Sequence, residues 1–238
     1  MKKLNTRLLS AILAAVLFLS CCPVVSLASG GFMIAYEGKK VTEISVDKHE
    51  KITVTAERAP EGTLQWQIKI PGTKVDYPVM QTPDRTDYYL KRNFEKKRSA
   101  AGSIYVREQC DVFAPSDNLT IYGHRMNSGS MFGQLMNYKK VEFWAENRYI
   151  YFDTLTHRGT YEIFAVFKIS ASVNNGFQYH LFVDMDQEKF AEFVEQCKTR
   201  SLYDTGVTAE YGDQLITLVT CAYHEEFGRF VVVARQQQ

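Results

Sequence analysis

The part of the sequence best suited to chemistry runs from residue 214 to residue 229 and reads QLITLVTCAYHEEFGR. An apolar, β-branched run ends at Cys221, and a second such run begins beside Arg229, eight positions later. Two runs of this kind on either side of a short loop predict a β-hairpin. The hairpin would carry a thiol at the end of one strand and a guanidinium at the start of the next.

These two side chains suggest nucleophilic attack on a carbonyl group. A thiol attacks only as the thiolate, so it needs a basic or cationic neighbour. The attacked carbonyl oxygen becomes negatively charged, and a fixed guanidinium stabilises that charge. Cys221 is therefore a candidate nucleophile, and Arg229 is a candidate for binding the oxyanion.

The base for this thiol would come from one of five histidines: His49, His124, His157, His180 and His224. His224 is near Cys221 in sequence, but a loop histidine of that kind is often only solvated. His180 lies among aromatic residues, and we expect it to be a packing or surface residue. His124 ends a predicted strand, as Cys221 ends another, so the two would meet if both strands ended at one rim.

Composition and cysteine spacing exclude other classes of function. Beyond residue 30 there are three cysteines, so at least one thiol is free or bonds to another molecule. No C-x-x-C pair and no histidine pair at helical spacing is present, so no metal site is predicted. The net charge of +1 gives no support for nucleic-acid binding.

The N-terminal region predicts a membrane-directed segment. Residues 8 to 27 carry no charge and follow a basic cluster. This length fits an uncleaved single-pass anchor or a secretory signal with a cleavage site at residues 26 to 28. Either would place the body of the protein outside the cytoplasm. We expect an anchor within residues 1 to 30, at the cell membrane, with an extracellular catalytic domain.

The rest of the chain predicts short strands and few helices. Residues 31 to 63 are read as a linker or N-terminal decorating segment, and residues 64 to 238 as the catalytic domain. Strand patterns occupy residues 64 to 70, 75 to 80, 102 to 106, 118 to 122, 148 to 153, 160 to 170, 215 to 221 and 230 to 233. Their number and the absence of a βαβ rhythm predict a closed or nearly closed β-barrel.

Helices are expected at three places in this domain. Residues 84 to 96 look helical but irregular, and one short helix follows His124. The long connection of residues 171 to 213 carries a third, capped by Asp186, with Phe190, Phe193, Val194 and Cys197 on its apolar face.

Three motifs resemble those of the sortase family, and of its class B most closely. They are YGHRMNSGSMF at residues 122 to 132, TLVTC at residues 217 to 221, and Gly228-Arg229. Their order and spacing are specific signals, and the similarity extends over about residues 64 to 235. The resemblance implies a mainly β fold, a closed eight-stranded sortase-type barrel with short helices and a long helix-containing connection before the cysteine strand.

The resemblance also implies a function and its site. Cys221, His124 and Arg229 would form the catalytic set of a cysteine transpeptidase that needs no metal or cofactor. Cys221 would cleave the C-terminal sorting signal of a surface protein or pilin after a threonine, through a thioacyl intermediate. The acceptor would be an amine, either of a lipid-linked peptidoglycan precursor or of a pilin lysine.

Further residues are expected to line the substrate groove. They are Tyr122 and Thr220, with Leu90 and Asn93 as weaker candidates, together with the connection of residues 171 to 213.

Two other functions stay open on the sequence alone. One is a papain-like or amidase-type cysteine hydrolase acting on cell-wall peptides. Such enzymes usually place the cysteine before the histidine and at the start of a helix, unlike Cys221, which follows His124 and ends a predicted strand. The other is a non-catalytic surface-binding barrel, against which the three motifs argue.

Overall fold

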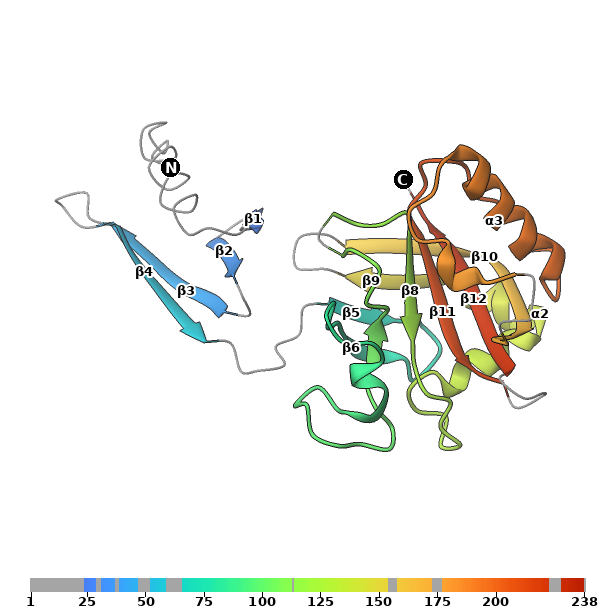
Figure 1. Ribbon diagram of the computed structural model, residues 1–238, viewed down its shortest axis with the longest axis horizontal. Helices are drawn as coiled ribbons and strands as arrows, with labels where there is room; N and C mark the ends of the chain where they lie inside the picture. Colours follow the sequence, from blue (N-terminus) through green and yellow to red (C-terminus); the bar gives the residue numbers. More distant parts are fainter. Residues whose placement is uncertain are drawn as a thin grey trace. The chain divides into compact units, whose positions relative to one another are not determined.

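The computed structural model describes residues 24–28, 31–36, 39–46, 52–58, 66–112, 114–153, 158–172, 177–222 and 228–237. The chain divides into two compact units, Met1–Thr63 and Leu64–Gln238. Figure 1 shows the elements of both units coloured along the sequence.

The first unit contains an antiparallel sheet in the order β1-β2-β3-β4. Its strands are β1 (Val24–Ala28), β2 (Gly31–Tyr36), β3 (Lys39–Val46) and β4 (Ile52–Arg58). No strand or helix was predicted within residues 31 to 63. A register shift between Val41 and Glu43 explains part of this difference. An irregularity of this kind breaks the period of two by which a strand is recognised.

The predicted single-pass anchor and membrane location are wrong. Val24–Ala28, the end of the uncharged run, form strand β1, which pairs with β2. Among the described residues, no helix has the length and apolar character needed to cross a membrane. Pro23 and the β-branched pair Val24-Val25 disfavour a helix here and favour a strand. Residues 1 to 23 lie outside the described part of the chain.

The second unit is the predicted closed barrel of eight strands. Its order is β10-β12-β11-β8-β7-β6-β5-β9. The strands are β5 (Trp66–Lys69), β6 (Asp76–Met80), β7 (Ile104–Val106), β8 (Asn118–Tyr122), β9 (Tyr149–Asp153), β10 (Arg158–Ser170), β11 (Leu215–Cys221) and β12 (Gly228–Gln236). Neighbours are antiparallel except for two parallel pairs, β6 with β7 and β8 with β11. The predicted strands are confirmed to within a few residues at their ends.

Apolar side chains that alternate along the strands form two cores. On β11, Ile216 and Leu218 belong to one buried cluster, while Leu215 and Val219 belong to another. The second cluster lies under helix α3 (Gln187–Arg200), which contributes Phe190, Phe193, Val194 and Cys197. Asp186 caps this helix, because its side chain accepts a hydrogen bond of 2.9 Å from the backbone N–H of Lys189. The predicted helix, its cap and its apolar face are confirmed.

The other helices are short. The region predicted as an irregular helix holds only the 3-10 helix η1 (Tyr88–Lys91). After His124 come η2 (Gly133–Lys139) and α2 (Val141–Glu146), where one helix was expected. The 3-10 helix η3 (Tyr179–Leu181) lies between β10 and α3.

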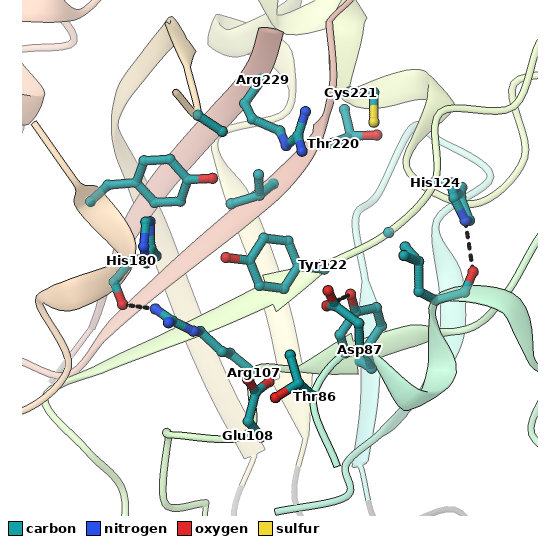
Figure 2. A pocket seen from close by; sticks show the side chains of 16 residues that line it. Thr86, Asp87, Arg107, Glu108, Tyr122, His124, His180, Thr220, Cys221 and Arg229 are labelled. Atoms are coloured by element: carbon teal, nitrogen blue, oxygen red, sulfur yellow. Dashed lines mark hydrogen bonds between the residues drawn. The ribbon is translucent and has the colours of Figure 1, made fainter. Parts of the chain in front are cut away.

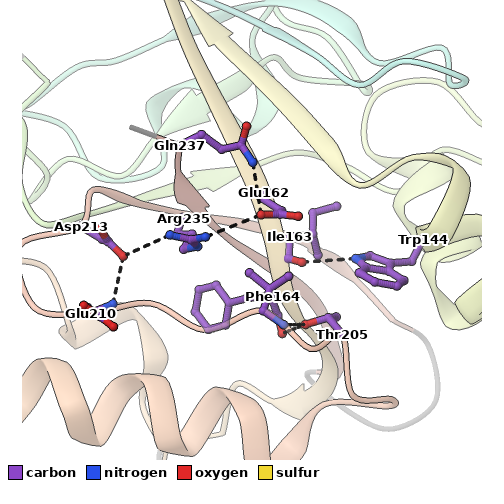
Figure 3. Close-up of polar contacts among 10 residues, drawn as sticks. Trp144, Glu162, Ile163, Phe164, Thr205, Glu210, Asp213, Arg235 and Gln237 are labelled. Carbon is purple, nitrogen blue, oxygen red and sulfur yellow. Dashed lines mark hydrogen bonds and ion pairs between the residues drawn. The ribbon is translucent and has the colours of Figure 1, made fainter.

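At an irregularity in β10, two backbone carbonyl groups accept hydrogen bonds from side chains outside the sheet. The register of β10 on β12 shifts between Ile163 and Ala165. The carbonyl of Ile163 accepts from Trp144 Nε1 (3.2 Å), and the carbonyl of Phe164 accepts from the Thr205 hydroxyl (2.9 Å), as Figure 3 shows. Nearby, Arg235 of β12 forms ion pairs with Glu162 (3.7 Å) and Asp213 (3.9 Å). These contacts tie the segment before β11 to the barrel.

Candidate active site

Strand register places the thiol and the guanidinium beside each other. β11 and β12 are antiparallel, and Cys221 pairs directly with Arg229. The backbone N–H of Ala222 donates to the carbonyl of Gly228 (2.9 Å), which extends the pairing past Cys221. Directly opposed residues project on the same face of a sheet. Pairing of the strands fixes the backbone of both residues. Both side chains are half-buried, so a ligand can reach them.

A parallel strand pair brings His124 to the same rim. β8 runs parallel to β11, with Tyr122 opposite Val219, and the Gly123 N–H donates to the Val219 carbonyl (3.1 Å). Parallel neighbours end at the same edge, so the residues two positions further on, His124 and Cys221, both lie there. The expectation that these two strand ends meet at one rim is confirmed.

His124 is oriented by a backbone carbonyl. Its Nε2 atom lies 2.7 Å from the carbonyl oxygen of Leu90 in η1 (Figure 2). A carbonyl oxygen only accepts, so Nε2 carries the proton in this contact. Gly102 makes the approach possible: it has φ +60°, and a Cβ atom at this position would overlap the Leu90 carbonyl oxygen.

These residues open into one cavity of about 270 Å³. Figure 2 shows Arg229, Thr220 and Cys221 on one side of it, Tyr122 in the middle, and Asp87, Arg107 and Glu108 on the opposite side. All of these residues line the cavity, as does His124. It therefore joins a reactive end to a polar end.

The predicted groove residues divide into two groups. Tyr122, Thr220 and Leu90 line the cavity, and so do Ala171, Tyr179 and His180 of the long connection. Asn93 is not among the lining residues. Its side-chain oxygen accepts from the backbone N–H of Lys97 (2.9 Å) and closes a local turn. His180, which we expected to be a packing or surface residue, belongs to the cavity wall.

The polar end of the cavity was not predicted from the sequence. The Tyr105 hydroxyl donates to the Asp87 carboxylate (2.6 Å), and Arg107 donates to the carbonyl of His180. One signal was available, because Tyr105 falls in the strand predicted at residues 102 to 106. In the structure it pairs with Tyr122 of β8, and their ring centroids are 5.6 Å apart. Asp87 gave no such signal, since it lies in an irregular segment with φ 52°.

Burial favours the uncharged forms of the cavity phenols and of His180. Desolvation, together with the hydrogen bond to Asp87, raises the pKa of Tyr105, and desolvation also raises the pKa of Tyr122 and Tyr179. Arg229 acts in the opposite direction on the Tyr179 pKa. Burial and the Arg107 charge lower the pKa of His180. These shifts favour the forms that donate or accept hydrogen bonds without adding charge.

The two other cysteines of this unit are packing residues. Cys110 and Cys197 are buried, and neither forms a disulfide. Cys110 lies within 3.6 Å of the Asn118 carbonyl and 3.5 Å of the Thr120 N–H. In the described ranges, no group of three or more His, Cys, Asp or Glu side chains could hold a metal ion. His49, His157 and His224 lie outside the described residues.

Comparisons with known proteins agree with this fold. The family model described as the sortase domain matches residues 68–237. Sortase B of Staphylococcus aureus (strain NCTC 8325 / PS 47) is 29% identical over 171 residues, which are 71% of this chain and 68% of that protein. Sortase B of Listeria monocytogenes serovar 1/2a (strain ATCC BAA-679 / EGD-e) is 30% identical over 168 residues, or 69% and 66% of the two chains. Among solved structures, one described as a Staphylococcus aureus sortase B-substrate complex is similar to this chain.

 For that complex the TM-score is 0.68 and the sequence identity 26%, with 75% of this chain and 82% of that chain covered.

Proposed function

The chain belongs to the sortase family and to its class B, whose members are cysteine transpeptidases, and we propose that it acts on a C-terminal sorting signal. In this proposal the enzyme cleaves the signal of a surface protein after a threonine. It then transfers the threonine carbonyl to an amine, of a peptidoglycan precursor or of a pilin lysine. The similar Staphylococcus aureus structure, described as a substrate complex, supports a bound substrate at this kind of site.

One observation carries the proposal: Cys221 pairs in register with Arg229 at the rim where His124 follows the parallel strand β8. The three side chains line one cavity of about 270 Å³. A nucleophile, an anion-binding group and a proton-transfer group are the parts that acyl transfer requires.

We assign the first half of the reaction to acylation of Cys221. The thiolate of Cys221, beside a protonated His124, attacks the threonine carbonyl carbon, so a C–S bond forms and the π electrons move to the carbonyl oxygen. As the tetrahedral intermediate collapses, the C–N bond breaks. The leaving amine takes a proton from His124, and a thioester on Cys221 remains.

The second half reverses these bond changes with a different amine. The acceptor amine attacks the thioester carbon and gives a proton to His124. The C–S bond breaks and restores the thiolate of Cys221. The Leu90 carbonyl, which contacts His124 Nε2, would hold the imidazole in one orientation through both steps.

Arg229 is assigned to the developing oxyanion. Its residue pairs with Cys221 and lines the same cavity, so we assign its guanidinium to the carbonyl that the sulfur attacks. Loss of one preorganised donor to an oxyanion lowers kcat by roughly 10²- to 10³-fold. We expect a loss of this size for Arg229→Gln, with the fold retained.

The test is the partition of product between water and an added amine. The full chain is incubated with a library of short peptides in which one threonine is fixed, with triglycine or Nα-acetyl-lysine amide as acceptor. We expect cleavage after the threonine and a product joined to the acceptor amine, measured by mass spectrometry. Product formed only by hydrolysis at saturating amine would instead indicate a cysteine hydrolase.

Matched cysteine variants connect this activity to the site. Cys221→Ala should abolish both cleavage and transfer. Cys197→Ala alters a buried cysteine outside the cavity and should retain them. Peptide binding by the wild-type chain without any turnover would indicate a binding barrel and would overturn the proposal.

A further inference from the structure

One wall of the cavity comes from a segment with little structure of its own. Tyr179 and His180 reach the cavity from η3, a 3-10 helix of three residues. Local hydrogen bonds within it are few: Leu181 N–H to the Gln178 carbonyl (2.9 Å) and Phe182 N–H to the Tyr179 carbonyl (3.4 Å). Such a short 3-10 turn does not fix its own position. Contacts with other elements must therefore place it.

Aromatic packing holds the outer side of this segment. The rings of Phe177 and Phe182 lie 6.0 Å and 5.3 Å from the ring of Phe193 on α3, measured between centroids. Apolar packing favours burial but is not directional. It keeps the segment against α3 and does not by itself decide which residue faces the cavity.

Hydrogen bonds from the start of β8 set the orientation of this segment. Asn118, which is fully buried, donates through Nδ2 to the Phe182 carbonyl (2.9 Å) and through its backbone N–H to the Val183 carbonyl (3.1 Å). The Asp117 carboxylate accepts from the Met185 N–H (2.6 Å). Phe182, Val183 and Met185 are thus hydrogen-bonded to Asp117 and Asn118 at the start of β8.

Thr217 fixes the orientation of Asn118. Its hydroxyl donates to Asn118 Oδ1 (2.8 Å), and both side chains are fully buried. This contact occupies the amide oxygen, so the Nδ2 group must point toward the Phe182 carbonyl. Thr217 lies on β11 and is not among the residues that line the cavity.

Arg107 holds the segment from the opposite wall. Its guanidinium donates to the carbonyl of His180. The backbone of Arg107 is itself fixed, because its N–H donates to the Thr120 carbonyl (2.9 Å) and its carbonyl accepts from Gln81 Nε2 (3.0 Å). Figure 2 shows the Arg107 contact reaching across to His180.

We propose that Asn118, oriented by Thr217, and Arg107 are positioning residues that fix the segment from Tyr179 to Met185 as the wall of the substrate cavity. A slip of this segment by one residue would break the bonds to the carbonyls of His180, Phe182 and Val183 together. It would also remove Tyr179 and His180 from the cavity. These residues therefore control peptide affinity and not the chemistry at Cys221, an assignment that rests on the proposed function.

The test compares two buried threonines that face each other in register. Thr217→Val removes the hydroxyl that orients Asn118. Thr120→Val makes the same change at the residue paired with Thr217, whose hydroxyl has no hydrogen-bond partner among the described residues. Both variants are made in the full chain, and both lie outside the cavity lining.

We expect Thr217→Val to raise KM roughly two- to tenfold, the factor that corresponds to one net hydrogen bond, with kcat unchanged. The substrate is the peptide selected from the threonine-fixed library. Hydrogen exchange at residues 182 to 185 should become faster, while the rate of Cys221 alkylation by iodoacetamide stays the same. Thr120→Val should match the wild type in all of these measurements.

Other results would overturn the positioning role. An unchanged KM and unchanged exchange for Thr217→Val would do so, as would equal effects of the two valine variants. If Thr217→Val does not fold, Arg107→Gln is measured in the same way and should give faster exchange in this segment. Failure of the wild type to turn over any peptide would instead refute the proposed function, and the exchange measurement would still decide whether the contacts hold the segment.

Discussion

At the scale of single residues, Cys221 differs from the other thiols of the barrel unit by its environment. Cys221 is half-buried at the rim, whereas Cys110 and Cys197 are buried. Burial raises the pKa of Cys110 to about 11 and raises that of Cys197 well above its usual value. Because only the thiolate is strongly nucleophilic, these two thiols are held in the unreactive form at neutral pH.

This difference predicts selective alkylation. Iodoacetamide at pH 8 should modify Cys221 well before Cys110 or Cys197, measured by mass spectrometry of digested peptides. The thiolate fraction of Cys110 increases as the pH approaches its pKa of about 11, so its share of the label should increase with pH. Equal modification of Cys110 and Cys221 at pH 8 would show that the described burial is wrong.

The sequence located some site residues and missed others for a physical reason. Cys221, Arg229 and His124 lie at the ends of strands with clear hydrophobic patterns, so their place in the barrel could be predicted. Asp87 lies in an irregular segment, and the contact of Arg107 with His180 joins two segments that are far apart in sequence. Contacts between distant segments leave no local pattern.

At the scale of elements, the pairing of β8 with β11 decides where His124 lies. The two strands are far apart in sequence, and only barrel closure makes them parallel neighbours with Tyr122 opposite Val219. The sequence therefore predicted both strands but could not show that they pair. η1 completes the arrangement, since its Leu90 carbonyl contacts the imidazole.

Gly102 provides a test of this arrangement. Gly102→Ala places a Cβ atom against the Leu90 carbonyl and forces alanine into φ +60°, so we expect the His124 contact to move and kcat to fall at least tenfold. Unfolding free energy should also fall by about 1 to 3 kcal/mol because of the positive φ. Steady-state kinetics and denaturant unfolding measure the two effects.

Gly206 is the matched control for this variant. It has φ +70°, but no atom lies within 4 Å of a Cβ atom built there. Gly206→Ala should therefore show the loss of stability without the loss of kcat. Equal kcat values for the two variants would contradict a role for the Leu90 carbonyl in orienting His124.

At the scale of the whole molecule, the barrel was predictable because its strands alternate clearly and no βαβ rhythm competes with them. The sheet of the first unit was harder to predict from the sequence. In β3 a register shift interrupts the alternation, and charged residues occur between the apolar ones. The uncharged run before it has the length of a membrane span, but length does not separate a helix from a strand, and its end is β1.

The central claim, that this class B sortase transfers acyl groups through Cys221, is tested most directly by trapping the intermediate. The full chain is mixed with the threonine-fixed peptide library without an acceptor, quenched in acid, digested and mapped by mass spectrometry. We predict a mass increase equal to the peptide fragment that ends in threonine, located on Cys221 and removed by added triglycine. Peptide cleavage by Cys221→Ala, or turnover by the wild type with the acyl group on a different residue, would contradict the account.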